Sequence, residues 1–192
     1  MAERVVLASG SPRRRELLER LGLTLTIISP DVDEDPLGRE DPVAYVRRLA
    51  IAKAFAVDAA DALVIAADTT VDLGGEILAK PNDAAHATEM LRRLSARTHR
   101  VHTGVAVRRG DVHVAEVVTS LVTFVPLTPA MIEWYVGTGE PLDKAGAYAV
   151  QGAGAVFVQR VRGSVSNVVG LPLHTVVRLA DELGVELLGQ AG

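Results

Sequence analysis

Short apolar runs alternate with amphipathic segments along most of the chain, and turn residues separate them. The runs at residues 5–8 and 23–28 predict strands. A continuous apolar run at 63–67 predicts a strand that is buried on both faces. Polar and apolar residues alternate over 100–108 and 112–125, which predicts a long antiparallel hairpin. Two further features complete the β-structure: a hairpin around Gly74-Gly75 and a strand over 155–161.

Capping residues mark the helices as clearly as periodicity does. A polar residue followed by proline begins three of them, because proline needs no amide partner at the first helical position. The predicted helices span residues 12–21 after Ser11, 42–57 after Asp41, 83–94 after Asn82 or Asp83, 129–137 after Thr128, and 171–183. Strands and helices in this mixed order, with long hairpins, predict an α/β protein with a mixed sheet.

Composition restricts the class of protein further. The 192 residues are 48% hydrophobic and 23% charged, which is ordinary for a globular protein of one domain or of two tightly joined lobes. The absence of cysteine excludes disulfides and zinc–thiolate sites. The net charge of −4 argues against nucleic acid as a partner. No apolar run is long enough for a signal peptide or a membrane helix, so neither export nor a membrane partner is expected.

Three consecutive arginines, Arg13, Arg14 and Arg15, follow Pro12 at a predicted helix start. A helix N-terminus is already partly positive, so each uncompensated cation there costs roughly 0.3–1 kcal/mol. The arginines are either solvated charges balanced by nearby glutamates, or part of an anion site formed with the backbone around Ser9. No P-loop or dinucleotide fingerprint is present.

Asp68 directly follows the apolar run LVIAA, at the carboxyl end of a strand, where α/β proteins usually bind ligands. It either binds substrate or bonds only to its own turn. Lys80 returns across the hairpin, opposite Thr69 if the loop has two residues and opposite Asp68 if it has three. Both registers place the ammonium near the carboxylate, and such a pair keeps Asp68 ionised.

Two loops and one helix offer further candidates. The acidic segment at 29–41 includes Glu34, which is either solvated or a second carboxylate for Mg²⁺. Lys53 is either a surface lysine or a phosphate contact. The glycine-rich stretch at 140–154 is either a plain turn or a ligand loop in which the amide of Gln151 reads a base edge.

Two pairs of ring side chains are assigned to structure. His99 and His102 are three apart on a strand and face opposite sides, which argues against a shared metal. Trp134 and Tyr135, in a predicted amphipathic helix, are expected to pack in the core.

Taken in order, these stretches resemble one family, the Maf proteins, which are nucleoside triphosphate pyrophosphatases. The matching segments are LASGSPRR (7–14), VDE (32–34), AADTTV (66–71), LAKP (78–81), LSARTHRVHTG (94–104), PLDKAGAYAVQG (141–152) and NVVGLPL (167–173). The resemblance implies a Maf/Ham1-like (ITPase-like) α/β fold. Residues 1–192 would form a single domain, with a mixed twisted sheet flanked by helices and two lobes around a central cleft. It also implies a cytoplasmic enzyme, often a homodimer, that uses a divalent cation, Mg²⁺ or Mn²⁺.

The family cleaves the α–β anhydride of a nucleoside triphosphate, giving the monophosphate and pyrophosphate. By resemblance, Asp68 is the proton acceptor. Arg13, Thr69 and Gln151 match the branch that acts on dTTP and UTP rather than on 7-methyl-GTP. Ala96 and Ala149 stand where glycine is common in the family.

The expected site follows from these assignments. Ser9, Arg13, Arg14, Lys53 and Lys80 would bind the triphosphate. Glu34 or Asp68 would hold the metal, and Asp68 would activate water for attack on the α-phosphorus. Three alternatives stay open at this stage: a pyrophosphatase for 7-methyl-GTP or other modified nucleotides, a nucleotide-binding regulator of septum formation, and a generic phosphatase.

Overall fold

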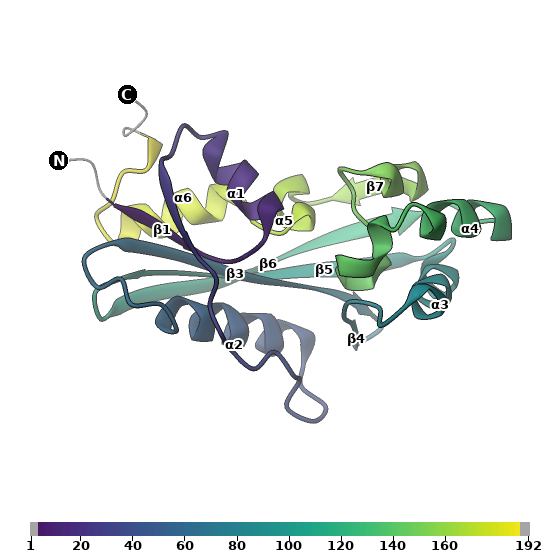
Figure 1. Cartoon of the computed structure of the whole chain (residues 1–192), viewed down its shortest axis with the longest axis horizontal. Helices are drawn as coiled ribbons and strands as arrows, with labels where there is room; N and C mark the ends of the chain where they lie inside the picture. The colour runs from purple at the N-terminus through teal and green to yellow at the C-terminus, as the bar shows by residue number, and fades with distance from the viewer. Residues whose placement is uncertain (1–3, 189–192) are drawn as a thin grey trace. The chain divides into compact units, whose positions relative to one another are not determined.

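The computed structural model describes residues 4–188 and is drawn in Figure 1. The strands are β1 (Val5–Ala8), β2 (Leu25–Ile28), β3 (Leu63–Leu73), β4 (Glu76–Leu78), β5 (Thr98–Arg109), β6 (Val112–Phe124) and β7 (Val158–Arg162). The α-helices are α1 (Pro12–Glu19), α2 (Pro42–Phe55), α3 (Ala84–Leu94), α4 (Pro129–Gly137), α5 (Val165–Val169) and α6 (Leu173–Glu182). Three 3₁₀ helices are η1 (Glu140–Asp143), η2 (Ala145–Ala147) and η3 (Ala153–Phe157).

The strands form one seven-stranded sheet in the order β2-β1-β3-β5-β6-β7, with β4 paired to β3. β1 is parallel to both β2 and β3, whereas β4 and β7 are antiparallel to their neighbours. The predicted α/β fold with a mixed sheet is therefore confirmed. The chain divides into two compact units, and β3, β5 and β6 each contribute residues to both.

Unit 1 comprises the chain up to Asp68, Thr103–Val118, and the chain from Gly170 onward. Within it, α1 and α6 lie on one face of the strands and α2 lies on the other (Figure 1). All four residues of β1 are buried, as are Leu63–Ala67 of β3. Alternate residues such as Val6 and Val64 share a core with Ala50 of α2. The prediction of a strand buried on both faces is confirmed, because helices cover both sides of the sheet here.

Unit 2 comprises Thr69–His102 and Thr119–Val169. Its core joins the β3–β4 hairpin to the apolar faces of α3 and α4 and to the segment before β7. Tyr135 is fully buried in this core, as predicted, but Trp134 is 53% exposed, so the prediction that both pack is wrong for Trp134. The buried side of α4 carries Ile132 and Tyr135, which are three residues apart, and Trp134 points about 100° away from Tyr135.

Most helix starts agree with the sequence, with one exception. The side chains of Asp41, Asp83 and Thr128 each accept hydrogen bonds from backbone amides of the helix that follows. Ser11 occupies the N-cap position of α1, but its side chain makes no capping hydrogen bond. The predicted hydroxyl cap is therefore wrong, although the helix begins at Pro12 as expected.

Several strands begin or end at other residues than the sequence predicts. β3 continues past the predicted end to Leu73, because its second half pairs with β4. β7 begins at Val158 rather than Ala155, because Ala153–Phe157 forms a 3₁₀ helix. α5 was not predicted. Ala96, at one of the positions where glycine is common in the resembled family, has a φ of 55°, in the region that favours glycine.

Candidate active site

The carboxyl ends of β1 and β3 bring the first group of polar residues together. Ala8 pairs with Ala66 in the parallel register, so Ser9 leaves β1 at the same edge at which Asp68 follows on β3. Both side chains lie in unit 1, and both residues are buried, Ser9 at 4% and Asp68 at 7% exposure. The edge has the topology that α/β sheets use for ligands.

Lys53 is the centre of this group. Its Nζ lies 2.6 Å from Asp68 Oδ1 and 2.6 Å from Glu34 Oε1. The side chains of Lys53 and Asp68 are 7% and 10% exposed, whereas that of Glu34 is 51% exposed. One buried ammonium therefore joins a buried carboxylate to a carboxylate that faces solvent.

The position of Lys53 follows from how α2 packs. Gly104 on β5 lets the helix backbone approach closely, because a Cβ at this residue would lie 2.2 Å from the carbonyl oxygen of Val46. Tyr45, on the same helix, donates its hydroxyl to the backbone carbonyl of Glu34 at 2.9 Å. α2 therefore places the ammonium and also fixes the backbone of the segment that carries its second carboxylate.

A second cation of α2 orders the rest of the acidic segment. Arg48 binds Glu40 through two hydrogen bonds of 2.8 and 2.7 Å. It also donates to the backbone carbonyl of Asp35 at 3.2 Å. This bidentate pair lowers the pKa of Glu40, chiefly through the hydrogen bonds from Arg48. The acidic segment is thus tied to α2 at both Glu34 and Glu40.

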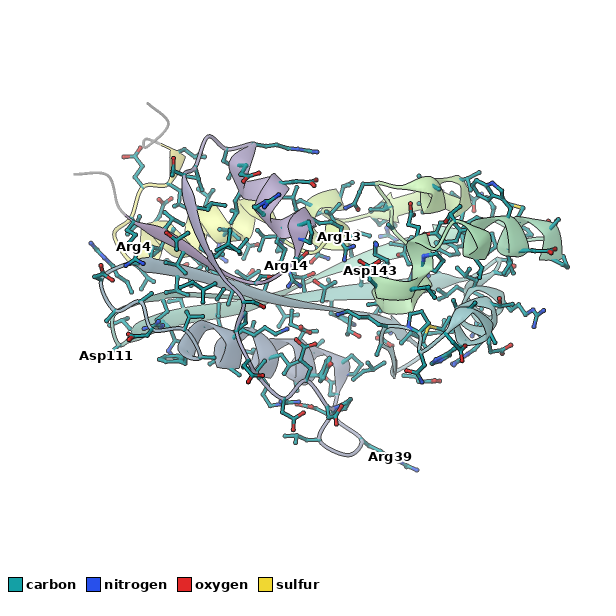
Figure 2. All side chains as sticks on the ribbon, viewed as in Figure 1. Arg4, Arg13, Arg14, Arg39, Asp111 and Asp143 are labelled. Carbon is teal, nitrogen blue, oxygen red and sulfur yellow. The ribbon has the colours of Figure 1, made fainter. Side chains whose placement is uncertain are left out.

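Of the three consecutive arginines, Arg14 forms hydrogen bonds within this group of residues. Its Nε donates to the carbonyl of Gly170 at 2.8 Å and its Nη1 donates to Ser9 Oγ at 3.1 Å. Burial lowers the pKa of this guanidinium, and the nearby Asp68 opposes that shift. Figure 2 shows Arg13 and Arg14 at the first turn of α1. Arg14 is therefore built into the site, not a solvated charge.

Burial and the nearby cations have opposite effects on the pKa of Asp68. Burial raises the pKa of Asp68 above its ordinary 3.8, although Lys53 and Arg14 pull it down. The expectation that a lysine partner governs its ionisation is therefore corrected: desolvation is the larger effect. Burial, assisted by the charges of Asp68 and Glu34, also raises the pKa of Tyr45 to about 12, so its hydroxyl keeps its proton.

The predicted residues thus fall into two sets. Ser9, Arg14, Glu34, Lys53 and Asp68 are connected within unit 1, where Arg13 also lies, partly exposed. Thr69, Lys80 and Gln151 belong to unit 2; Thr69 is partly exposed and the other two are exposed.

The hairpin register, left open by the sequence, is that of the two-residue loop. Leu73 pairs with Glu76 and Val71 with Leu78, and both Gly74 and Gly75 have positive φ. Continued further, this register aligns Thr69 with Lys80. The lysine that contacts Asp68 is Lys53, whose i,i+15 relation to it gives no periodic signal. The proximity of Lys80 to Asp68 stays a prediction.

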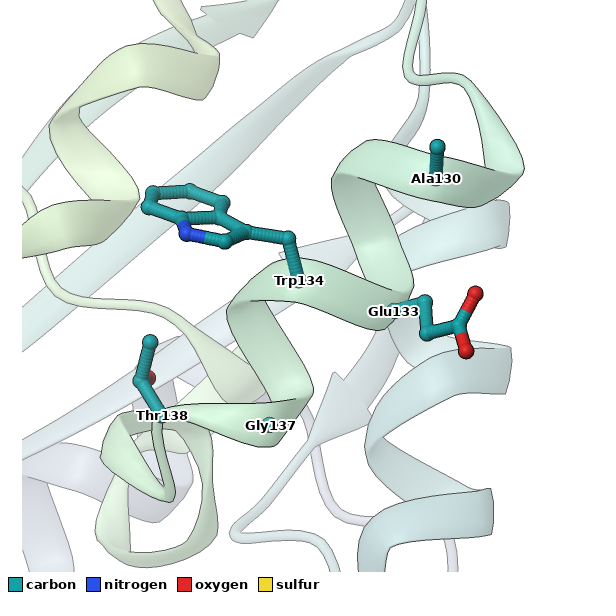
Figure 3. A pocket seen from close by; sticks show the side chains of 5 residues that line it. All are labelled: Ala130, Glu133, Trp134, Gly137 and Thr138. Atoms are coloured by element: carbon teal, nitrogen blue, oxygen red, sulfur yellow. The ribbon is translucent and has the colours of Figure 1, made fainter.

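The two histidines and the hollow on α4 do not involve the predicted site residues. His99 Nε2 lies 2.8 Å from the Tyr148 hydroxyl, and His102 Nε2 lies 3.1 Å from Asp72 Oδ2, so the two histidines have different partners. A shallow hollow on α4, lined by Ala130, Glu133, Trp134, Gly137 and Thr138, is drawn in Figure 3. None of the predicted site residues lines it.

Two features are absent from residues 4–188. No helix there is long and apolar enough to cross a membrane. No cluster of three or more histidine, aspartate or glutamate side chains there is arranged to hold a metal ion. The Lys53 cluster contains two carboxylates, those of Asp68 and Glu34.

The chain is similar to curated proteins over nearly its whole length. The chain is 56% identical over 191 residues to a dTTP/UTP pyrophosphatase of Anaeromyxobacter dehalogenans (strain 2CP-C), covering 97% of both chains. It is 53% identical to a protein of the same name from Moorella thermoacetica, over 97% of this chain and 98% of that one. A third, from Symbiobacterium thermophilum, is 46% identical over 99% of this chain and all of its own length.

A solved HAM1 protein from Coxiella burnetii aligns with 65% of this chain and 73% of its own, at 17% identity and a TM-score of 0.45. The model of the Maf-like protein family matches residues 4–183, which include every residue of the site. That match and the near full-length identity to curated relatives establish that the chain belongs to the Maf family.

Proposed function

We propose that this protein hydrolyses the α–β phosphoanhydride of dTTP and UTP, releasing the nucleoside monophosphate and pyrophosphate. The observation that carries the proposal is the shared ammonium of Lys53 between Asp68 and Glu34, beside the built-in guanidinium of Arg14. Catalysis needs a proton acceptor and fixed positive charge together. The names of the relatives supply the substrates.

The unit 1 residues divide the chemical work. Arg14 lies in the first turn of α1 and donates to Ser9, which precedes the helix, and the helix dipole there also favours phosphate. The ammonium of Lys53 carries a compact positive charge, and it can exchange its carboxylate partners for a phosphate oxygen. Asp68, with its raised pKa, accepts a proton from the attacking water, and fixed cations stabilise the charge that develops on phosphorus-bound oxygens.

The remaining residues take their roles from the family. Arg13, Thr69 and Gln151 are proposed to select a pyrimidine base, and Lys80 to bind phosphate. Thr69 directly follows Asp68, so selectivity and proton transfer are assigned to consecutive residues of β3. Association into a homodimer and a cytoplasmic location remain predictions of the resemblance. Size-exclusion chromatography with light scattering tests the first.

A divalent cation fits the donor set at Asp68 and Glu34. Their oxygens each reach the same Lys53 nitrogen at 2.6 Å, so they lie no further apart than twice that distance. Mg²⁺ characteristically uses one or two carboxylates and completes its shell with water and substrate phosphates. Bound there, it would polarise the attacked phosphorus. Lys53 competes for the same oxygens, so we expect the ammonium to turn towards phosphate when a cation is present.

A panel of nucleoside triphosphates, assayed with and without Mg²⁺ or Mn²⁺, tests the proposal. We expect pyrophosphate from dTTP and UTP, faster than from 7-methyl-GTP. Orthophosphate as the product would indicate a phosphatase instead. Binding of dTTP without any pyrophosphate release would indicate a regulator.

Asp68→Asn keeps the size of the side chain and removes the proton acceptor. We expect turnover of dTTP to fall at least about 100-fold, which is within the range for loss of a general base. Asp61→Asn is the matched control, because Asp61 pairs with Arg4 at the surface of the same unit. A folded Asp68→Asn protein with near-normal turnover would remove Asp68 from the mechanism.

A further inference from the structure

Gln151 lies in a tight turn whose two sides are held by one side chain from α4 and one from η1. The amide of Gly152 donates to the carbonyl of Ala149 at 3.3 Å, so Val150 and Gln151 are the central residues of a β-turn. Gln151 is exposed, and η3 begins directly after the turn at Ala153. The direction of its amide therefore depends on what fixes residues 149–154.

Ala149, the first residue of the turn, is held by a tyrosine. The hydroxyl of Tyr135, on α4, accepts a hydrogen bond from the amide of Ala149 at 3.1 Å. The same hydroxyl donates to Glu140 Oε1 at 2.7 Å. Tyr135 is fully buried, and its ring packs edge-on against Phe157 with centroids 4.9 Å apart, so the hydroxyl has a fixed position.

The residues after the turn are held by the glutamate. Glu140 Oε2 accepts from the amide of Ala153 at 3.0 Å, and Oε1 accepts from that of Gly154 at 3.2 Å. These are the first amides of η3, so the carboxylate caps that helix. Burial opposes ionisation of Glu140, but the hydrogen bonds from Tyr135 and the two amides outweigh it and lower its pKa.

Two glycines allow this close arrangement. A Cβ at Gly152 would lie 2.3 Å from Glu140 Oε2, and one at Gly154 would lie 2.7 Å from the Tyr135 hydroxyl. Neither position requires a positive φ, so absence of a side chain, not backbone freedom, is what each glycine supplies here. Close contacts with Tyr135 and Glu140 therefore explain why glycine occupies positions 152 and 154.

We infer that Tyr135 and Glu140 are positioning residues that set base selectivity by clamping both sides of the Gln151 turn. The inference rests on the proposed pyrimidine triphosphate pyrophosphatase function, and it adds two residues that the family motifs do not assign to selectivity. The pair acts through the turn: one hydroxyl and one carboxylate fix residues 149, 153 and 154, and Gln151 is presented between them.

Tyr135→Phe tests the clamp with the least disturbance, because it removes both hydroxyl hydrogen bonds and keeps the ring. We expect the KM for dTTP to rise about three- to tenfold, which corresponds to loss of one hydrogen bond between Gln151 and the base. We expect kcat to change by less than about twofold. The preference for dTTP over dGTP should fall by the same factor. Tyr148→Phe is the matched control, since it removes another buried hydroxyl, which lies 2.8 Å from His99 Nε2 on β5.

The variant Gln151→Ala separates positioning from a general structural effect. If the clamp acts through Gln151, Tyr135→Phe will have no further effect on KM in the Gln151→Ala protein. An undiminished effect in that background, or an unchanged KM and preference in Tyr135→Phe alone, would overturn the inference.

Hydrogen exchange of residues 149–154 gives a readout that does not depend on activity. We expect faster exchange in Tyr135→Phe and in Glu140→Gln, and the parental rate in Tyr148→Phe. Parental exchange in both clamp variants would overturn the clamp itself. If the parent releases no pyrophosphate from dTTP or UTP, the proposed function fails, and the Kd for dTTP in the same variants then decides the clamp.

Discussion

Replacing Lys53 with methionine removes the ammonium and retains a stem of similar length. The buried carboxylate of Asp68 then loses a partner at 2.6 Å, and so does Glu34. Removing one partner of a buried ion pair typically costs about 3–5 kcal/mol, because the other charge is left without compensation. Arg14 still stabilises the ionised form of Asp68.

Protonation limits this loss. Asp68 can become neutral in the variant, and starting from the ordinary pKa of 3.8 this costs about 4.4 kcal/mol at pH 7, at 1.36 kcal/mol per pH unit. We therefore expect the free energy of unfolding to fall by about 3–4 kcal/mol at pH 7. A carboxylate with a raised pKa in the folded state loses stability as pH rises, so the deficit shrinks on acidification. At pH 5 the cost of protonating Asp68, again from a pKa of 3.8, is about 1.6 kcal/mol, so the stability deficit should not exceed that value.

Urea unfolding of the parent and Lys53→Met at pH 5, 6 and 7 measures both the size and the slope. Lys80→Met is the control, because Lys80 is exposed and its loss should change stability by less than about 0.5 kcal/mol. Both variants are expected to lose activity, so stability alone distinguishes them. A Lys53→Met deficit under about 1 kcal/mol at pH 7, or one that does not depend on pH, would refute the reasoning.

Three further outcomes are expected. Burial lowers the pKa of His99 to about 4 from 6.5, so its contribution to stability is lost as pH falls; about 2 kcal/mol should disappear between pH 7.5 and 5, and His99→Gln should lack this dependence in urea titrations. Thr128→Ala should cost about 1 kcal/mol and Ser11→Ala much less, because only Thr128 makes a capping hydrogen bond; equal losses by thermal unfolding would contradict this. Ala96→Gly should raise stability by roughly 0.5–1 kcal/mol by relieving a positive φ, and a lower melting temperature would argue against strain there.

The sequence supplied the local elements because their signals lie within a few residues. Asp41, Asp83 and Thr128 cap their helices as predicted, and Gly74-Gly75 forms the hairpin loop. Where a prediction depended on the surroundings, it failed. The hydroxyl of Ser11 does not cap its helix, and Trp134 faces outward.

The candidate site shows the same division. The residue types indicated Ser9, Arg14, Glu34, Lys53 and Asp68 as candidates, and the order of the matching segments indicated the family. The pattern did not indicate that Lys53 is the partner of Asp68, because that contact depends on how α2 packs against β5 at Gly104.

The sequence by itself determined the elements, the mixed α/β class and the family, since these depend on local propensity and on motif order. Only the tertiary structure decided which lysine pairs with Asp68, that burial outweighs that pairing in its pKa, and that Tyr135 and Glu140 hold the Gln151 turn. The physical reason is that burial and hydrogen-bond partners come from segments far apart in the chain. Periodicity carries no information about those contacts.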